Sequence, residues 1–185
     1  MTVAELSLWH DVPLVAEGGQ EGGQLFNFIC EIPKCTRKKF EVATTEGATP
    51  IKQDEKKGVL REFKKGDIFF NYGCFPRTWE DPRHVSPDTG YPGDNDPLDV
   101  CEIGLRQVQT GEIRPVKVLG VLAMIDDDET DWKVVVCVEI NQCVVCTSVI
   151  DAAVLAPESG EESASPRHRA GVASSTWRSH NAPRK

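Results

Sequence analysis

Three aspartates fall within the stretch Gly93-Asp94-Asn95-Asp96-Pro97-Leu98-Asp99. Each carboxylate needs water, a hydrogen-bond donor or a cation, so packing alone does not explain such a dense cluster of like charges. Hard cations such as Mg²⁺ take oxygen ligands and keep several waters. The stretch therefore predicts a divalent-cation site. A solvated acidic turn is the alternative interpretation, because short acidic motifs occur often without a metal.

A second acidic cluster, residues 126–131, lies between two apolar runs. If Asp131 and Lys133 open the second run as a strand, they share one face, because strand side chains alternate. The same alternation places Lys39 and Glu41 on one face of an earlier segment. Carboxylates bind metals, whereas lysine and arginine bind phosphate oxygens. This mixture predicts a substrate that brings metal and phosphate together.

The overall composition excludes several classes of protein. With 185 residues, 39% hydrophobic and 27% charged, the chain is typical of a globular protein with one core. The net charge of -8 argues against a general binder of nucleic acid or of anionic membranes. A nucleic-acid module would need a basic groove with stacking aromatic residues. No apolar run approaches the ~18 residues of a membrane span.

Cysteine usage and the N-terminal composition indicate the compartment. Seven cysteines without regular spacing favour reduced thiols in a cytosol-like environment. The first 24 residues contain several carboxylates and no arginine, which is typical of neither a signal peptide nor a transit peptide. We therefore expect a cytoplasmic protein.

The chain divides into three parts by composition. Residues 1–24 are expected to form a loosely ordered lead-in. Residues 25–141 contain short apolar and aromatic segments between glycines and prolines, without helical periodicity, which predicts a mainly β fold built as a small barrel. Residues 142–185 are rich in Ser, Ala, Pro and Arg and are predicted to be a disordered tail.

The stretch from Asp94 to Val100 resembles the signature of family I soluble inorganic pyrophosphatases. Several other stretches resemble that family in the same order: residues 26–33, 39–41, 57–61, 71–76, 78–82 and 129–133. The stretch 78–82, which contains Trp-Glu-Asp-Pro, and the stretch 129–133 point to the eukaryotic type of the family. The resemblance runs from about Trp9 to Asn141. It implies an OB-like five-stranded barrel.

The resemblance also implies a role for each matched residue. Asp96 resembles the residue that holds the attacking water and takes its proton. The remaining roles are metal ligation by Asp94, Asp99, Asp126, Asp131 and Glu41, phosphate binding by Lys39, Arg61, Tyr72 and Lys133, and support by Glu31 and Glu129. Several Mg²⁺ ions, pyrophosphate as substrate and a homodimer are implied with them.

The activity implied by the resemblance is hydrolysis of pyrophosphate to two phosphates by a Mg²⁺-activated water. The family continues past Asn141 with helices and a Tyr-Lys pair that binds phosphate, and residues 142–185 resemble neither. We therefore expect a domain truncated at its C-terminus, with most of those helices missing. The alternative function is a non-catalytic isoform or fragment that keeps metal or phosphate binding.

Overall fold

The computed structural model describes residues 6–17, 24–138 and 171–172. One short helix, α1 (Leu8–Asp11), precedes the strands. The strands of the main sheet are β1 (Phe26–Ile32), β6 (Asn71–Cys74), β7 (Asp99–Glu102), β8 (Ile113–Asp126), β9 (Glu129–Cys137) and β10 (Gly171–Val172). Two separate hairpins are formed by β2 (Phe40–Val42) with β3 (Ile51–Gln53), and by β4 (Glu55–Lys56) with β5 (Val59–Leu60).

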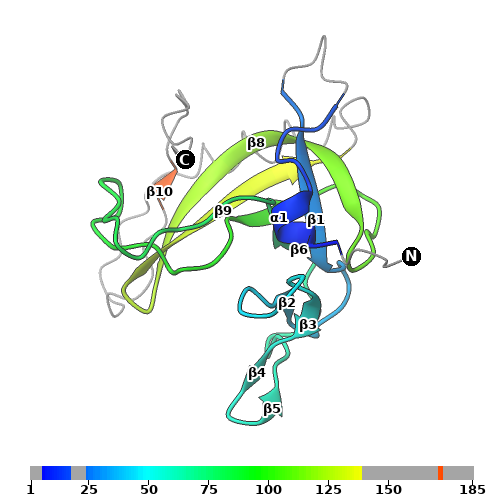
Figure 1. The fold of residues 1–185 in the computed structure, drawn as a ribbon, viewed down its shortest axis with the longest axis horizontal. Helices are drawn as coiled ribbons and strands as arrows, with labels where there is room; N and C mark the ends of the chain where they lie inside the picture. The colour runs from blue at the N-terminus through cyan, green and yellow to red at the C-terminus, as the bar shows by residue number, and fades with distance from the viewer. Residues whose placement is uncertain (1–5, 18–23, 139–170, 173–185) are drawn as a thin grey trace, which may run out of the picture.

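Five strands of the main sheet close on themselves. Their order is β1-β6-β7-β9-β8, and β8 also pairs with β1, so the pairing returns to the first strand. All of these pairs are antiparallel except β7 with β9. The long, curved β8 arches over β9 in Figure 1. The predicted mainly β fold of five strands is confirmed.

Alternation along the strands separates two apolar clusters. On β1, Phe28 and Cys30 pack inside the ring with valines of β7, β8 and β9, namely Val100, Val116, Val134 and Val136. Ile29, on the opposite face of β1, packs with Val42 and Cys74, and Trp9 of α1 covers them. The outer face of the ring is therefore partly covered by α1 and by the β2–β3 hairpin. The helix α1 is too short to show periodicity in the sequence.

Two tight turns set the registers of the β8–β9 and β4–β5 hairpins. Asp127 and Asp128 connect β8 to β9 with φ of 45° and 67°. Lys57 and Gly58 connect β4 to β5 with φ of 57° and 76°. Two-residue hairpin turns with both φ values positive match the right-handed twist of the flanking strands. In Figure 1 the β4–β5 hairpin extends away from the ring, beyond the β2–β3 hairpin.

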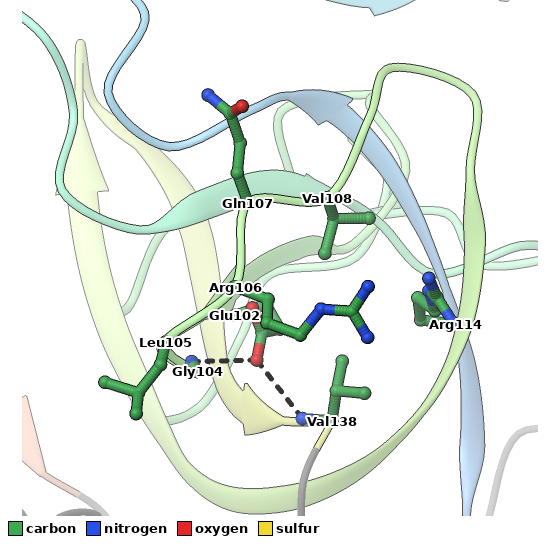
Figure 2. A pocket seen from close by; sticks show the side chains of 8 residues that line it. All are labelled: Glu102, Gly104, Leu105, Arg106, Gln107, Val108, Arg114 and Val138. Atoms are coloured by element: carbon green, nitrogen blue, oxygen red, sulfur yellow. Dashed lines mark hydrogen bonds between the residues drawn. The ribbon is translucent and has the colours of Figure 1, made fainter.

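The buried carboxylate of Glu102 joins the ends of β6, β7 and β9. Glu102 is 1% exposed. One of its oxygens accepts hydrogen bonds from the backbone N–H groups of Gly104 (2.8 Å) and Val138 (3.1 Å), as Figure 2 shows. The other oxygen accepts from Asn71 Nδ2 at 2.7 Å. None of the predicted site residues lines the cavity beside Glu102.

Parts of the predicted organisation lie outside the described residues. These parts are residues 1–5, 18–23, 139–170 and 173–185. The disordered tail and the three domain boundaries therefore stay predictions. Within 171–172, the backbone of β10 pairs with Leu122 and Ala123 of β8. In the part of the chain that the structure describes, no helix is long and apolar enough to cross a membrane.

Candidate active site

The candidate site begins where β6, β7 and β9 lie side by side. In the parallel pairing of β7 with β9, Asp99 lies opposite Lys133. Their chain neighbours Val100 and Val134 point into the apolar interior, so Asp99 and Lys133 face the outside of the ring. Lys133 and Asp131 share that face, as the sequence predicted.

Lys133 is the centre of a dense network of hydrogen bonds. Its ammonium group donates to the carboxylates of Asp99 and Asp131 and to Tyr72 Oη at 3.0 Å. Burial alone would lower the pKa of Lys133, but the two carboxylates raise it above its usual range. Burial, together with Asp99, also raises the pKa of Tyr72. Lys133 is therefore a fixed positive charge and Tyr72 a neutral hydroxyl.

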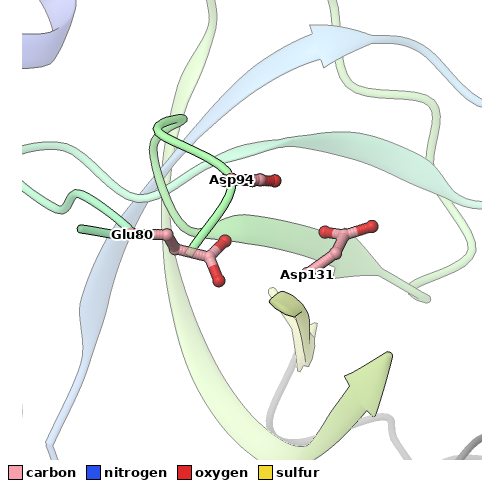
Figure 3. A group of neighbouring side chains, drawn as sticks. All are labelled: Glu80, Asp94 and Asp131. Atoms are coloured by element: carbon pink, nitrogen blue, oxygen red, sulfur yellow. The ribbon is translucent and has the colours of Figure 1, made fainter. Parts of the chain in front are cut away.

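A group of three carboxylates lies beside this network. Glu80, Asp94 and Asp131 each offer an oxygen, and these oxygens all lie within 4.8 Å of one another (Figure 3). The sequence predicted Asp94 and Asp131 as metal ligands but assigned no role to Glu80. Glu80 lies in a loop beside Asp81, and this pair has no alternating or helical spacing that would mark a site. Its only signal was its place in the family-like stretch Trp79-Glu80-Asp81-Pro82.

The electrostatics of this group favour a bound cation. One oxygen of Glu80 accepts from Trp132 N at 3.1 Å, while the buried Oε2 atom has no hydrogen-bond partner among the described residues. Burial, with the neighbouring charge of Asp94, raises the pKa of Glu80 to about 9. Burial likewise raises the pKa of Asp94 to about 6. A divalent cation would offset the repulsion and supply the missing partner of Glu80, so these residues fit a metal.

Backbone pairing fixes the loop that carries Asp94 and Asp96. The N–H of Asn95 donates to the Glu80 carbonyl, and the N–H of Glu80 donates to the Asp96 carbonyl, both at 2.9 Å. At Gly93 an added Cβ would lie 2.5 Å from the carbonyl carbon of Glu80, so only glycine allows this approach. The two loops therefore position Glu80 and Asp94 together.

The predicted base, Asp96, lies on the same loop. Its N–H donates to Asp94 Oδ1 at 3.0 Å, which closes a local turn. Burial and the nearby charges of Glu41 and Asp99 raise the pKa of its carboxyl, and Lys39 opposes that shift. Asp96 therefore lies in the electrostatic field of neighbouring carboxylates and of Lys39.

Two further cationic residues, Lys39 and Arg61, come from the segments next to β2 and β5. Asp54 accepts hydrogen bonds from Lys39 Nζ (3.2 Å) and from the Arg61 guanidinium. Lys39 Nζ also lies 3.4 Å from Glu41 Oε2, as expected for residues on one strand face. Partial burial would raise the pKa of Asp54, but Lys39 and Arg61 lower it. Sequence reasoning missed Asp54, which lies in an ordinary charged stretch.

The remaining predicted residues occupy different environments. Glu31 is 4% exposed, accepts from Val42 N at 2.7 Å, and has its pKa raised by burial to about 8. Asp126 and Glu129 pair at the exposed end of the β8–β9 hairpin. They are not part of the group formed by Glu80, Asp94 and Asp131. The roles predicted for all of these residues stay predictions.

Comparison with known proteins identifies the family. The family model described as inorganic pyrophosphatase matches residues 28–158. The chain belongs to the inorganic pyrophosphatase family. The match continues beyond Asn141, where the resemblance in the sequence ended.

Relatives of this family are similar along most of the chain. Inorganic pyrophosphatase 1 of Caenorhabditis elegans is 52% identical over 134 residues, which are 70% of this chain and 31% of that protein. Inorganic pyrophosphatase of Dictyostelium discoideum is 53% identical over 136 residues, which are 74% of this chain and 47% of that protein. The chain thus spans half or less of the length of these two curated relatives.

Solved structures share the fold. The type I inorganic pyrophosphatase of Toxoplasma gondii has a TM-score of 0.68 at 50% identity, covering 72% of this chain and 59% of that one. The N-terminally truncated vacuolar soluble pyrophosphatase of Trypanosoma cruzi, solved in complex with PPi, has a TM-score of 0.72 at 45% identity. That match covers 83% of this chain and 60% of the other.

Proposed function

We propose that this chain hydrolyses inorganic pyrophosphate with Mg²⁺ as its cofactor. One observation carries the proposal: the carboxylates of Glu80, Asp94 and Asp131 converge beside the Asp99–Lys133–Tyr72 network. This arrangement supports the proposal, because oxygen ligands suited to hard cations would lie next to donors suited to phosphate oxygens. Membership of the pyrophosphatase family supports the same substrate.

The carboxylates divide into ligands and a base. Asp94, Asp99 and Asp131 would hold the tightest Mg²⁺, Glu80 would join them, and further ions would use Glu41 and Asp126. Bound Mg²⁺ would lower the pKa of water and neutralise charge on the phosphates. Asp96 would accept the proton of the attacking water. Its raised pKa makes its carboxylate a better proton acceptor than an ordinary aspartate.

The cations would hold the substrate. Lys133 of β9 and Tyr72 of β6 would donate hydrogen bonds to the substrate from beside the acidic group. Lys39, just before β2, and Arg61, just after β5, would donate further hydrogen bonds. Lys133 is charged and Tyr72 protonated at neutral pH, so both can donate to phosphate oxygens. The PPi complex of the Trypanosoma cruzi relative supports pyrophosphate as the ligand. Glu31 and Glu129 would support this arrangement.

We also propose a cytoplasmic location and a homodimer. Among the described residues, the free thiols of Cys30, Cys35, Cys74 and Cys101 fit a reducing compartment. The dimer rests on the family resemblance, and sedimentation of the purified chain measures it.

Phosphate release from pyrophosphate tests the activity. The purified chain should release two phosphates per pyrophosphate with Mg²⁺ and none with EDTA. Calorimetry on the same sample measures Mg²⁺ binding, which distinguishes catalysis from the alternative function of binding without turnover. A folded chain that binds Mg²⁺ without releasing phosphate would be a non-catalytic binding protein, and one that does neither would overturn the proposal.

A further inference from the structure

Trp79 is an aromatic residue that packing does not explain. Its side chain belongs to the exposed large hydrophobic residues of the chain, at 44% exposure. Its indole ring carries one polar atom, the Nε1–H donor. That donor bonds to Asn95 Oδ1 at 3.0 Å, across sixteen residues of chain. Trp79 therefore has a specific contact with a residue that lies between Asp94 and Asp96.

Asn95 is the point at which the acidic loop reverses. Its φ is 72°, in the left-handed region that asparagine tolerates better than most residues. The flanking backbone is held by the pairing of Asn95 N and Asp96 O with Glu80, but that pairing leaves the tip exposed. A side-chain bond from Trp79 fixes the tip itself.

The ring of Trp79 is also held in place. The guanidinium carbon of Arg83 lies 5.2 Å from the ring centroid, a distance suited to a cation–π contact. Arg83 in turn bonds through two nitrogens to the carboxylate of Asp81. The donor that reaches Asn95 therefore comes from an anchored ring, although the ring is exposed.

We propose that Trp79 is a positioning residue, which acts through Asn95 to hold Asp94 and Asp96 in the geometry that binds the cation. The proposal rests on the proposed function, because it needs the acidic group to bind Mg²⁺. The exposed indole N–H would then contribute to cation affinity and not to packing of the core. One hydrogen bond of ordinary strength corresponds to about a fivefold change in affinity.

Calorimetric titration of the full chain with Mg²⁺ tests the proposal in a double-mutant cycle. Trp79→Phe keeps an aromatic ring for Arg83 and removes the N–H donor. Asn95→Gly keeps the positive φ without strain and removes the acceptor. Each variant should weaken Mg²⁺ binding about fivefold. The double variant should bind no more weakly than either single variant, because both changes remove the same bond.

The other outcomes distinguish a failure of the role of Trp79 from a failure of the proposed function. Wild-type affinity in Trp79→Phe, with Mg²⁺ bound by the wild type, would overturn the role of Trp79 and leave the proposed function intact. A lower melting temperature without weaker Mg²⁺ binding would overturn it too, because it would assign the bond to stability alone. Losses that add in the double variant would overturn the coupling to Asn95. A wild type that binds no Mg²⁺ would overturn both the proposed function and this inference.

Discussion

Asp99 and Lys133 lie opposite each other on the parallel strands β7 and β9, and the Lys133 ammonium group donates to the Asp99 carboxylate. The same ammonium group bonds to Asp131, so one lysine partly offsets the charge of two predicted metal ligands. We expect a cation that binds these carboxylates to displace the ammonium group from them. Lys133 would then be free to bind a phosphate oxygen. The expectation is that the metal and the lysine compete for the same carboxylates.

Replacing Lys133 by methionine tests this competition. Without the ammonium charge, Asp99 and Asp131 should bind Mg²⁺ more tightly. Without Mg²⁺, two largely buried carboxylates lose their partner, so the chain should be destabilised by about 3 kcal/mol or more. Phosphate release should fall by roughly 10²–10³ because a donor to the substrate is lost. Calorimetry and thermal melts measure the first two effects. Unchanged Mg²⁺ affinity would contradict the competition.

Cation binding should release protons. At pH 7 Glu80, with a pKa of about 9, is protonated, and Asp94, with a pKa of about 6, is mostly ionised. A cation favours the ionised forms, so its affinity should rise as the pH rises towards 9. Titration with Mg²⁺ in two buffers of different ionisation enthalpy should reveal about one proton released at pH 7. Glu80→Gln should abolish most of that release. Equal release in this variant would mean that Glu80 is not a ligand.

Buried Glu31 should make stability depend on pH. Its folded pKa of about 8 lies above its ordinary value of 4.5, so the folded chain holds a proton that the unfolded chain loses. The contribution of Glu31 to stability is therefore full below pH 4.5 and falls as the pH rises to 8, by on the order of 5 kcal/mol. In Glu31→Gln that dependence should disappear, and the hydrogen bond from Val42 N can remain. Urea unfolding of both proteins without metal, from pH 5 to pH 9, measures the difference. Parallel pH profiles would contradict the prediction.

Asp54 should matter for substrate binding although it is a carboxylate. It fixes Lys39 and Arg61 at the same time, so Asp54→Asn should leave both cations less well oriented. We expect KM for pyrophosphate to rise about tenfold, with a smaller change in kcat. Asp67→Asn is the matched control, since Asp67 pairs with Arg37 on the exposed surface. Equal effects of the two variants would remove the role of Asp54.

Local pattern predicted much of this site. Alternation was enough to place Lys39 with Glu41 and Asp131 with Lys133, because each pair lies on one short stretch of extended chain. Lys39 directly precedes β2, and the second pair lies within β9. Glu80 could not be found in this way, since it reaches the site through loop pairing with residues fifteen and sixteen positions away. The Asp99–Lys133 contact depends on the parallel register of β7 and β9. Such long-range pairing is specified by the packing of the whole ring and leaves no local periodicity.

The most direct test of the central claim is phosphate release from pyrophosphate with Mg²⁺, measured for three chains side by side. The wild type and Asp127→Asn, a change in the exposed β8–β9 turn, should release phosphate at similar rates. Asp96→Asn, which cannot accept the proton of the attacking water, should be slower by about 10² or more. Equal rates in all three chains, or no release by a folded wild type that binds Mg²⁺, would contradict the account.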